Sequence, residues 1–530
     1  MALAPEHIAS RELRSLNPAT LEAVGAVAVT PPGDVAEVVV AAQRAQKRWA
    51  ETPLEERAEL LGRVGDLCLD HADELAALIT AETGKPLTES YSCDLALSLD
   101  NIRWTAANAA KVLAAERLGT PQPHLQHKRG YLVYEPLGVL AVIAPWNFPL
   151  ALPLSIVATG VAAGNAVVLK PSELTPLTGD WVERLFAAAG APEGLVAVVQ
   201  GEAEVGEALV RAPGVAKVFF TGSTAVGARV AAACGELVRP VTLELGGKDP
   251  MLVFADADVD RAVEGAAFGA FVNCGQVCTS VERLYVEEEL YDRFVSALAD
   301  RAQQLHVGRG DEDGTDLGPL VSEGQRGRVE DLVADALEEG AEAVSGARRP
   351  DVGLPGWFYE PTVLAAGEGA LRIDSEEIFG PVVTVRPFAD EDEAVRLANA
   401  SRYGLGASVW TRDLERAKRL AHRLEAGMVW TNDVGYSYGA GQASWGGTKD
   451  SGFGVTHSRH GLYGASRVKY TDLDGGRLRA PWWYPYRPGA PDAFRGFLNV
   501  VYGRGAGRRL RAAWRERRGL IGLGRAYFRG

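Results

Sequence analysis

The chain has 530 residues, too many for one ordinary domain, because single hydrophobic cores stop growing at roughly 250–300 residues. A hydrophobic fraction of 47% and a charged fraction of 23% exclude a wholly disordered chain, a collagen and a coiled coil. The net charge is −14, but the residues from Asp472 onward carry 13 Arg against 4 acids, so the preceding body carries −23. An acidic body argues against nucleic-acid binding there.

The sequence also predicts the compartment. It has no run of about 18 uncharged apolar residues, so we expect no transmembrane helix. The N-terminal residues include His7, Arg11 and Glu12 before any long apolar run, which is unlike a signal peptide. The five cysteines cannot all pair within the chain, and at this length they favour a reducing compartment. We therefore expect a cytoplasmic protein.

The first 120 residues are expected to be mostly helical. Apolar residues recur at helical spacing from Asp34, again between Pro53 and Lys85, and between Ser90 and about Ala115. The residues 128–133 and 139–143 are rich in β-formers, with a turn at 136–138 between them.

From Pro145 onward, short apolar strands alternate with helices, which indicates a parallel sheet covered on both faces. Ligands of such sheets bind at the carboxyl ends of the strands. Five residues at these ends are candidates to bind a dinucleotide: Lys170, Ser172, Gly201, Gly222 and Ser223. A second alternating region extends from about Met251 to Trp445.

Two of these strand ends have a specific chemistry. Gly222 and Ser223 begin a predicted helix, whose N-terminus suits a pyrophosphate, although an ordinary strand–helix turn explains them equally well. Lys170, Ser172 and Glu173 could hold an adenosine ribose, or Ser172 and Glu173 could simply cap a helix. Glu173 would favour a free 2′-hydroxyl.

Three other residues are candidates for covalent chemistry. Cys278 could be a nucleophile, although a lone cysteine is more often a buried apolar residue. A zinc site at Cys274 and Cys278 would need two further ligands, so we predict no metal. Glu244 ends an apolar strand, where burial raises a carboxyl pKa and suits a general base. The Asn147 amide, between two prolines, could donate to an oxyanion.

Seven motifs follow one another along the chain: PWNFP, KPSE, FTGS, ELGGK, GQVC, EEIFGPV and GGTKDSGFG. Together and in this order, they resemble the aldehyde dehydrogenase superfamily over roughly Arg14 to Leu473. The resemblance implies that Cys278 attacks an aldehyde to form a thiohemiacetal and then a thioester. It implies that Asn147 and the Cys278 amide stabilise the oxyanion, and that Glu244 activates water to release the acid.

The resemblance also implies NAD as cofactor, with NADP possible because the KPSE pattern often tolerates it. The expected cofactor-binding residues come from several motifs: Trp146, Lys170, Ser172, Glu173, Gly201, Gly222, Ser223, Leu245, Gly246, Glu377 and Phe379. Within the family, two alternatives remain, an acylating dehydrogenase that hands the thioester to coenzyme A and a non-catalytic structural or binding protein. Acylating members commonly lack the glutamate that is present here as Glu244.

Two departures from the family pattern affect a suggested proton relay. Many members carry a lysine where this chain has Ile156, and many hydrolytic members carry a glutamate where it has Thr456. The pattern of His457 and His460 is more like that of the branch for fatty and aromatic aldehydes, which favours medium- or long-chain aliphatic or aromatic substrates. Both histidines could equally be ordinary surface or interface residues.

The expected fold class is α/β, with a doubly wound parallel-sheet cofactor domain (residues 1–120 and 139–247) and a second α/β catalytic domain (248–445). A small bridging β element (121–138 and 446–473) is expected to pair subunits into a dimer or tetramer. The residues 474–530 are a C-terminal extension, expected as an extended arm with aromatic anchors, a short helix and a basic amphipathic segment. We expect this arm to dock on an acidic subunit surface; the alternatives are an anionic membrane surface, nucleic acid, or no partner.

Overall fold

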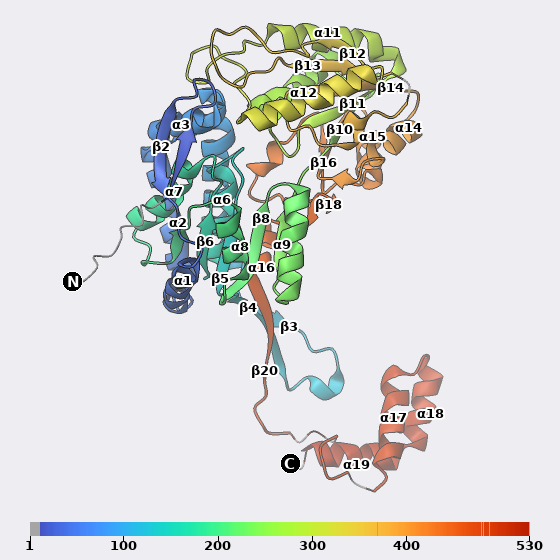
Figure 1. The fold of residues 1–530 in the computed structure, drawn as a ribbon. Helices are drawn as coiled ribbons and strands as arrows, with labels where there is room; N and C mark the ends of the chain where they lie inside the picture. The colour runs from blue at the N-terminus through green and yellow to red at the C-terminus, as the bar shows by residue number, and fades with distance from the viewer. Residues whose placement is uncertain (1–10, 368, 479, 481, 487, 529–530) are drawn as a thin grey trace, which may run out of the picture. The chain divides into compact units, whose positions relative to one another are not determined.

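The computed structural model describes residues 11–367, 369–478, 480, 482–486 and 488–528 (Figure 1). By their internal contacts, these residues form two compact units. The first unit contains the residues up to Leu113 and Glu135–Arg467, and the second contains Ala114–Tyr134 and the residues from Val468 onward. The division therefore keeps the two large sheets together and assigns most of the small sheet, with the C-terminal extension, to the second unit.

The first unit begins with a hairpin that the sequence did not predict. Strands β1 (Glu12–Leu16) and β2 (Ala23–Ala28) pair antiparallel, where we expected mostly helix. Asn17 makes the turn, since its side-chain Oδ1 accepts the backbone N–H of Ala19 at 2.8 Å. The helices that follow agree with the expected periodicity: α1 (Val35–Trp49), α2 (Leu54–Asp70), α3 (Ala72–Thr83), α4 (Leu87–Glu89), a π-helical turn (Ser90–Leu95) and α5 (Ala96–Val112).

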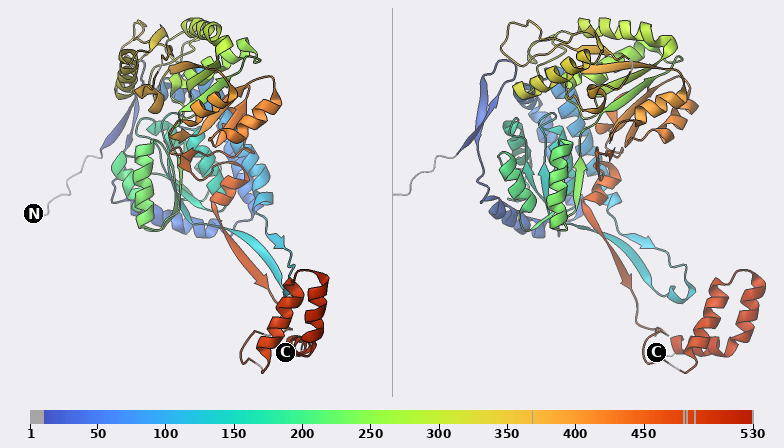
Figure 2. Two further views of the ribbon diagram at one scale, coloured as in Figure 1. Left: turned by 90° about the vertical axis from the view of Figure 1, so that its right-hand side faces the viewer. Right: turned by 45° about the vertical axis from the view of Figure 1, so that its right-hand side comes forward.

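The first large sheet is doubly wound, as predicted (Figure 2). Its strand order is β19-β9-β8-β5-β6-β7, and every pair is parallel except β19 with β9. Helices α1, α8 and α9 cover one face, and α6 and α7 pack on the other. The bounds are β5 (Val139–Ile143), α6 (Ala151–Ala162), β6 (Ala166–Lys170), α7 (Pro176–Ala188), β7 (Val196–Val198), α8 (Ala203–Arg211), β8 (Val215–Thr221), α9 (Thr224–Glu236), β9 (Val241–Glu244) and β19 (Gly452–Phe453).

The second large sheet has the order β12-β13-β14-β11-β10-β16-β17. Alternate residues of the interior strand β10 and of the residue that follows it are buried in two cores, with Met251 and Val253 on one face and Leu252 and Phe254 on the other. The bounds are β10 (Asp249–Val253), α10 (Val259–Phe271), β11 (Val281–Glu287), α11 (Tyr291–Gln304), α12 (Glu323–Glu338), β12 (Glu342–Ser345), β13 (Thr362–Ala365), α13 (Arg372–Ser375), β14 (Val382–Phe388), α14 (Glu391–Asn399), β15 (Tyr403–Gly404), β16 (Gly406–Trp410), α15 (Leu414–Arg423) and β17 (Met428–Thr431).

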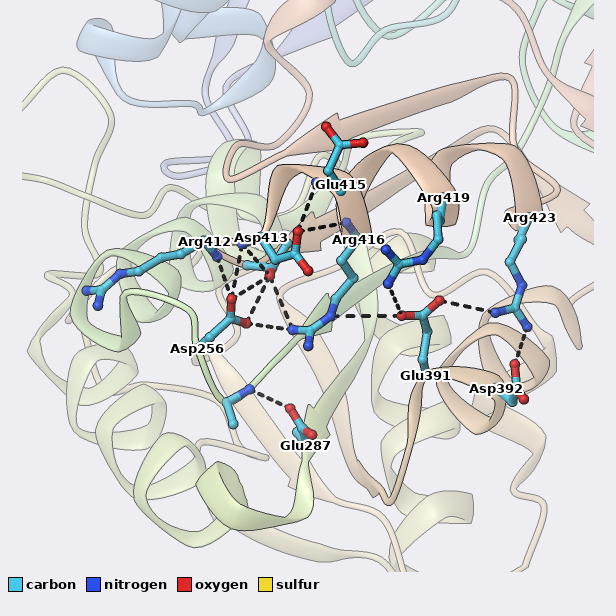
Figure 3. A network of polar contacts seen from close by, with 12 residues as sticks. Asp256, Glu287, Glu391, Asp392, Arg412, Asp413, Glu415, Arg416, Arg419 and Arg423 are labelled. Atoms are coloured by element: carbon cyan, nitrogen blue, oxygen red, sulfur yellow. Dashed lines mark hydrogen bonds and ion pairs between the residues drawn. The ribbon is translucent and has the colours of Figure 1, made fainter.

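A network of acids and arginines joins α14 and α15 to the end of β10 (Figure 3). Asp256 accepts hydrogen bonds from the Thr411 hydroxyl at 2.9 Å and from Arg416 at 2.7 Å. Glu391 accepts from Arg419 at 3.0 Å. Exposed ion pairs contribute little each, so we assign this network to orienting the two helices rather than to most of their stability.

The structure corrects the expected start of the bridging element. Of the residues 446–473, β18 (Thr448–Lys449), β19 and α16 (Ser458–Gly464) lie in the first unit, and β19 completes the cofactor sheet. Only β20 (Ser466–Leu473) pairs with β4 (Arg129–Pro136), which pairs in turn with β3 (Glu116–Leu118). The bridging strand begins later than expected because the glycine-rich residues 446–454 contribute β19 to the cofactor sheet, a pairing that one sequence does not reveal.

The C-terminal extension is more helical than expected. It forms α17 (Ala490–Tyr502), α18 (Ala506–Arg515) and α19 (Arg517–Phe528), which pack on one another. Among the described residues, half of the exposed large apolar side chains lie between Val468 and Ile521, with Leu510 71% and Trp514 72% exposed. None of the helices in the described ranges is both long and apolar enough to cross a membrane.

Candidate active site

The predicted site residues gather at the carboxyl ends of the first sheet's strands. Asn147 follows β5, Lys170 ends β6, and Glu244 ends β9. Parallel strands expose this edge to ligands, because the chain must leave the sheet there through loops. Cys278 comes from a different element, the loop between α10 and β11 of the second sheet.

A tight left-handed turn positions the Cys278 loop. Asn273, Cys274 and Gly275 all have positive φ angles of 52°, 57° and 69°. A side chain at Gly275 would collide with the carbonyl oxygen of Gly380, so only glycine fits this close approach. Non-glycine residues in this region are strained, and such strain is commonly concentrated at functional sites.

Cys278 is a free thiol in a partly buried, apolar setting. It packs against a cluster made of Leu405, Met428, Trp430 and Trp445. Burial, followed by the charges of nearby carboxylates including Asp249 and Glu244, raises the pKa of the Cys278 thiol. The sulfur is therefore protonated at neutral pH in this state and needs a base before it can attack a carbonyl.

Asn147 is held by hydrogen bonds on both its side chain and its backbone. Its Nδ2 donates to the Gln276 carbonyl oxygen at 3.1 Å, two residues before Cys278. Its own carbonyl oxygen accepts from Lys85 Nζ at 2.7 Å and from Asn273 Nδ2 at 2.9 Å. The amide thus lies beside the cysteine loop in a fixed orientation.

Glu244 has the features expected of a general base. The side chain is 7% exposed, and neither carboxylate oxygen has a hydrogen-bond partner among the described residues. Burial raises its pKa well above the ordinary value. The adjacent segment β19 pairs Gly452 with Glu244, which fixes the strand end.

The ribose candidates at the end of β6 lie together. The Lys170 ammonium donates to the Pro171 carbonyl oxygen at 2.8 Å and lies 3.5 Å from Glu173. Ser172 Oγ accepts the backbone N–H of Leu174 at 3.2 Å in a turn before α7, whose N-cap is Thr175, so neither Ser172 nor Glu173 caps that helix. Burial lowers the pKa of Lys170, and Glu173 acts against that change.

The pyrophosphate candidates are the start of α9 and a nearby glycine. Ser223 is the N-cap residue, and its Oγ accepts the backbone N–H of Val226 at 3.4 Å. The Gly222 N–H donates to the Glu244 carbonyl oxygen at 3.0 Å, which ties this helix start to the strand of the base. Gly201 precedes α8, and a Cβ there would collide with Val205.

The nicotinamide candidates also come together. The rings of Trp146 and Phe379 meet edge to face, with centroids 5.4 Å apart. Glu377 accepts the Gly247 N–H at 3.0 Å, and the lack of a side chain at Gly246 leaves room for the carboxylate. Burial raises the pKa of Glu377 to about 7. Leu245 is buried beside them and packs on Gly227 of α9.

Several positioning residues were missed by the sequence reasoning. The fully buried pair Lys248–Glu282, 2.6 Å apart, holds the Glu377 loop, because Glu282 also accepts the N–H groups of Ile378 and Phe379. Lys85 holds the Asn147 loop in the same way. A charged residue inside a buried strand was the available signal for Glu282 of β11, since an unpaired buried charge is too costly to keep, whereas Lys248 lies in the loop before β10.

The polar groups that the protein places at this site are of the kinds that bind a dinucleotide. Along one sheet edge it offers a helix N-terminus for phosphates, a lysine–glutamate pair for a ribose, and an edge-to-face aromatic pair beside a buried carboxylate. Among the described residues, no group of three or more His, Cys, Asp or Glu is arranged to hold a metal ion.

Comparisons with known proteins agree with this chemistry. The sequence profile described as "Aldehyde dehydrogenase family" matches residues 6–471. The chain is 40% identical to 3-sulfolactaldehyde dehydrogenase of Pseudomonas putida (87% of this chain, 93% of the relative). It is 41% identical to phenylacetaldehyde dehydrogenase of Pseudomonas fluorescens (84% and 89%). The solved NAD⁺ complex of an aldehyde dehydrogenase from Bacillus cereus superposes with a TM-score of 0.84 at 36% identity, covering 88% of this chain and 94% of that one. The chain therefore belongs to the aldehyde dehydrogenase family and is an NAD(P)-dependent enzyme.

Proposed function

We propose that this enzyme oxidises medium- or long-chain aliphatic or aromatic aldehydes to carboxylic acids, with Cys278 as the nucleophile. The observation that carries the substrate class is the apolar cluster against which Cys278 packs. Two tryptophans, a leucine and a methionine form it, and Tyr438 packs against it too. Such a surface favours an apolar substrate, because it removes apolar area from water.

In the first step, the Cys278 sulfur bonds to the aldehyde carbon, and its proton passes to Glu244. Negative charge then develops on the carbonyl oxygen. The Asn147 amide and the Cys278 backbone N–H would donate hydrogen bonds to that oxygen. The contacts of Asn147 with Lys85 and Gln276 support this role, because they orient the amide before the substrate arrives.

The cofactor-binding roles follow the geometry of the sheet edge. Lys170, Ser172 and Glu173 would hold the adenosine ribose, and Glu377 the nicotinamide ribose. Gly201, Gly222 and Ser223 would meet the pyrophosphate, while Trp146, Phe379, Leu245 and Gly246 would shape the ring site. When bound, NAD(P) accepts the hydride that converts the thiohemiacetal to a thioester.

Glu244 first releases to solvent the proton that it took from Cys278. In the last step, its carboxylate accepts a proton from a water as that water attacks the thioester carbon. The carbon–sulfur bond breaks, and the acid leaves. The unpartnered, buried Glu244 carboxyl supports hydrolysis over transfer to coenzyme A, because a base for water is superfluous when a thiol is the acceptor. We further propose a cytoplasmic location, which five free cysteines support.

We also propose a homo-oligomer, a dimer or tetramer, in which the C-terminal arm docks on a subunit. The exposed Leu510 and Trp514 of α18, flanked by arginines, support a surface made for an acidic apolar partner. Sedimentation of the full chain against the variant Leu510→Glu/Trp514→Glu tests this. An unchanged oligomer would contradict the docking, whereas binding of the wild type to anionic vesicles would favour a membrane instead.

The substrate test is a series of initial rates of NADH formation at saturating NAD. The aldehydes extend from acetaldehyde to dodecanal, with benzaldehyde, phenylacetaldehyde, betaine aldehyde and succinic semialdehyde. We expect kcat/KM to rise with apolar area. A maximum at succinic semialdehyde would contradict the apolar substrate class, and the absence of turnover with either nicotinamide would contradict the assignment of Cys278, Glu244 and Asn147.

A further inference from the structure

The two groups that would stabilise the oxyanion come from different sheets of the fold. Asn147 follows β5 of the first large sheet, and Cys278 lies in the loop before β11 of the second. An oxyanion hole requires both donors to converge on one position, because a hydrogen bond weakens steeply as its distance and angle depart from the optimum. The protein must therefore fix the Asn147 loop against the Cys278 loop.

The Asn273 side chain links these two loops directly. Its Nδ2 donates to the Asn147 carbonyl oxygen at 2.9 Å and to the Gln276 carbonyl oxygen at 3.1 Å. Gln276 lies two residues before Cys278, so one amide group binds both loops. Asn273 is only 1% exposed, so bulk water does not compete for either hydrogen bond.

The Gln276 carbonyl oxygen also orients the Asn147 side chain. It accepts a hydrogen bond from Asn147 Nδ2 at 3.1 Å, in addition to the one from Asn273. A primary amide has two N–H donors, so the second N–H of Asn147 can serve the oxyanion. The direction of that N–H therefore depends on where Asn273 holds the Gln276 carbonyl group.

The backbone of Asn273 is held on both sides. Its N–H donates to Glu89 Oε2 of α4 at 2.9 Å. Its carbonyl oxygen accepts the Gln276 N–H at 3.1 Å and Gln276 Nε2 at 2.9 Å. Gln276 Oε1 in turn accepts the Val321 N–H at 2.9 Å. Several contacts at once thus hold Asn273 in its left-handed conformation, with a φ of 52°.

The residue type at position 273 meets two requirements at once. The left-handed backbone is one that asparagine tolerates better than most residues that carry a side chain. The link between the loops needs two N–H donors on a short side chain, and a primary amide supplies them. Glycine would meet only the first requirement. Aspartate would also meet the first, but an ionised carboxylate only accepts hydrogen bonds.

Neither carbonyl oxygen needs Asn273 in order to be paired. The Asn147 carbonyl oxygen keeps its hydrogen bond from Lys85 Nζ at 2.7 Å, and the Gln276 carbonyl oxygen keeps the one from Asn147 Nδ2 at 3.1 Å. Loss of the Asn273 amide would therefore leave no orphaned acceptor at these two positions. We expect a variant without this amide to fold, but to lose the fixed separation of the two loops.

We propose that Asn273 is a positioning residue that holds the Asn147 amide and the Cys278 N–H at the separation that the oxyanion requires. This inference rests on the proposed function. When the Cys278 sulfur bonds to the aldehyde carbon, the thiol proton passes to Glu244 and an electron pair of the carbonyl bond moves onto the oxygen. Asn273 acts on this step through the carbonyl oxygens of Asn147 and Gln276.

The first test is Asn273→Gly in the full-length enzyme, which keeps a left-handed backbone and removes the amide. We expect kcat/KM for the best aldehyde of the series to fall about 10- to 100-fold, because a displacement of about 1 Å in a catalytic site can cost that much. The Kd for NAD should stay within about twofold, since the link serves the oxyanion and not the cofactor. An unchanged kcat/KM would overturn the proposal.

The matched control is Asn432→Gly. Asn432 also has a left-handed backbone, with a φ of 53°, and its Nδ2 donates to the Thr411 carbonyl oxygen at 2.9 Å. It lies directly after β17, so the same substitution is made at the same backbone conformation outside the proposed link. This variant should keep the wild-type kcat/KM. A loss equal to that of Asn273→Gly would assign the effect to backbone flexibility and overturn the proposal.

Trifluoromethyl hexyl ketone separates the oxyanion from hydride transfer. Its carbonyl carbon carries no hydrogen, so the adduct with Cys278 forms the oxygen anion and cannot proceed to a thioester. We expect the Ki of this ketone to rise in Asn273→Gly by the same factor as kcat/KM falls. A general loosening of the site would weaken NAD binding as well. An unchanged Ki beside a reduced kcat/KM would overturn the proposal.

A double-mutant cycle with Asn147→Ala tests whether Asn273 acts through the oxyanion hole. Once the Asn147 amide is absent, the separation of the two donors no longer matters, so adding Asn273→Gly should lower kcat/KM by less than about threefold. Losses that multiply would show independent effects of the two residues and overturn the proposal. A wild type that gives no NADH burst with any aldehyde would instead overturn the proposed function.

Discussion

Lys85 donates a hydrogen bond from its fully buried ammonium to the backbone carbonyl oxygen of Asn147, at 2.7 Å. The same ammonium pairs with Asp94 at 2.7 Å. Asp94 in turn accepts the N–H groups of Leu150 and Ala151, at the start of α6. One buried ion pair therefore holds both the oxyanion candidate and the helix that follows it.

Replacing Lys85 should damage stability and catalysis together. In Lys85→Met, Asp94 loses its buried partner, and removal of one partner of such a pair costs about 3–5 kcal/mol. We expect a lower denaturant midpoint and a reduced kcat/KM, because Asn147 loses its support. The exposed Lys111→Met on α5 is the matched control. Equal denaturant midpoints for the two variants would contradict the structural role.

Cys278 should react with alkylating agents slowly at neutral pH. Because burial raises its thiol pKa, the thiolate fraction is small, and it should grow about tenfold per pH unit. Iodoacetamide inactivation should therefore speed up steadily from pH 7 to pH 9 without a plateau. Cys278→Ala should abolish NADH formation, while Cys68→Ala, in the core of α2, should not. A plateau below pH 7.5 would show that the thiolate is already formed.

Glu244→Gln should separate the two halves of the reaction. The thioester should form more slowly, because Cys278 also passes its proton to Glu244, but one burst of NADH should remain, while steady turnover falls by about 100- to 10,000-fold. In the wild type, the base form of Glu244 appears only above a raised pKa, so kcat should climb with pH in the neutral range. Stopped-flow absorbance measures both. Full multiple turnover by Glu244→Gln would remove this residue from the hydrolytic step.

Asp249 should make the fold weaker as the pH rises. Burial raises its pKa to about 8 in the fold, against about 3.9 in an unfolded chain. Below about pH 4 the Asp249 carboxyl is protonated in both states and costs the fold nothing. As the pH rises toward 8, the free energy of unfolding falls, because the carboxyl ionises less readily in the fold than in the unfolded chain. Asp249→Asn should gain Tm relative to the wild type between pH 5 and pH 8. A Tm difference that is constant over this range would contradict the prediction.

Glu173 should set the preference between the two nicotinamide cofactors. Its carboxylate, 45% exposed and 3.5 Å from Lys170, would repel a 2′-phosphate. Glu173→Gln should therefore lower the KM for NADP more than it changes the KM for NAD, since Lys170 remains. Glu202→Gln, an exposed neighbour paired with Arg11, is the control. An unchanged ratio of the two KM values would assign the preference to other residues.

The sequence alone predicted the cofactor sheet and the residues that lie at the ends of its strands. Alternating short strands and helices predicted the doubly wound sheet, and the motif residues of that edge do lie along it. The hairpin β1–β2 was missed because Arg11 to Ala28 has no strong apolar alternation. The roles of Glu282 and Lys85 were missed because their contacts join distant parts of the chain. Glu282 pairs with Lys248, 34 positions away, and Lys85 reaches the Asn147 carbonyl oxygen across 62 positions. The helical packing of α17 with α19 was missed for a similar reason, since Ala493 and Gly519 meet only in the fold.

The pairing of β19 with β9 has a consequence for biosynthesis. β9 carries Glu244 and would be an edge strand until Gly452 and Phe453 are made and add beside it. Ser451 also accepts the Leu245 N–H and donates to the Gly246 carbonyl oxygen. A ribosome-bound chain that ends before these residues has its cysteine but an unfinished base strand. We therefore expect the enzyme to become active only after these late residues have been made and have paired with β9.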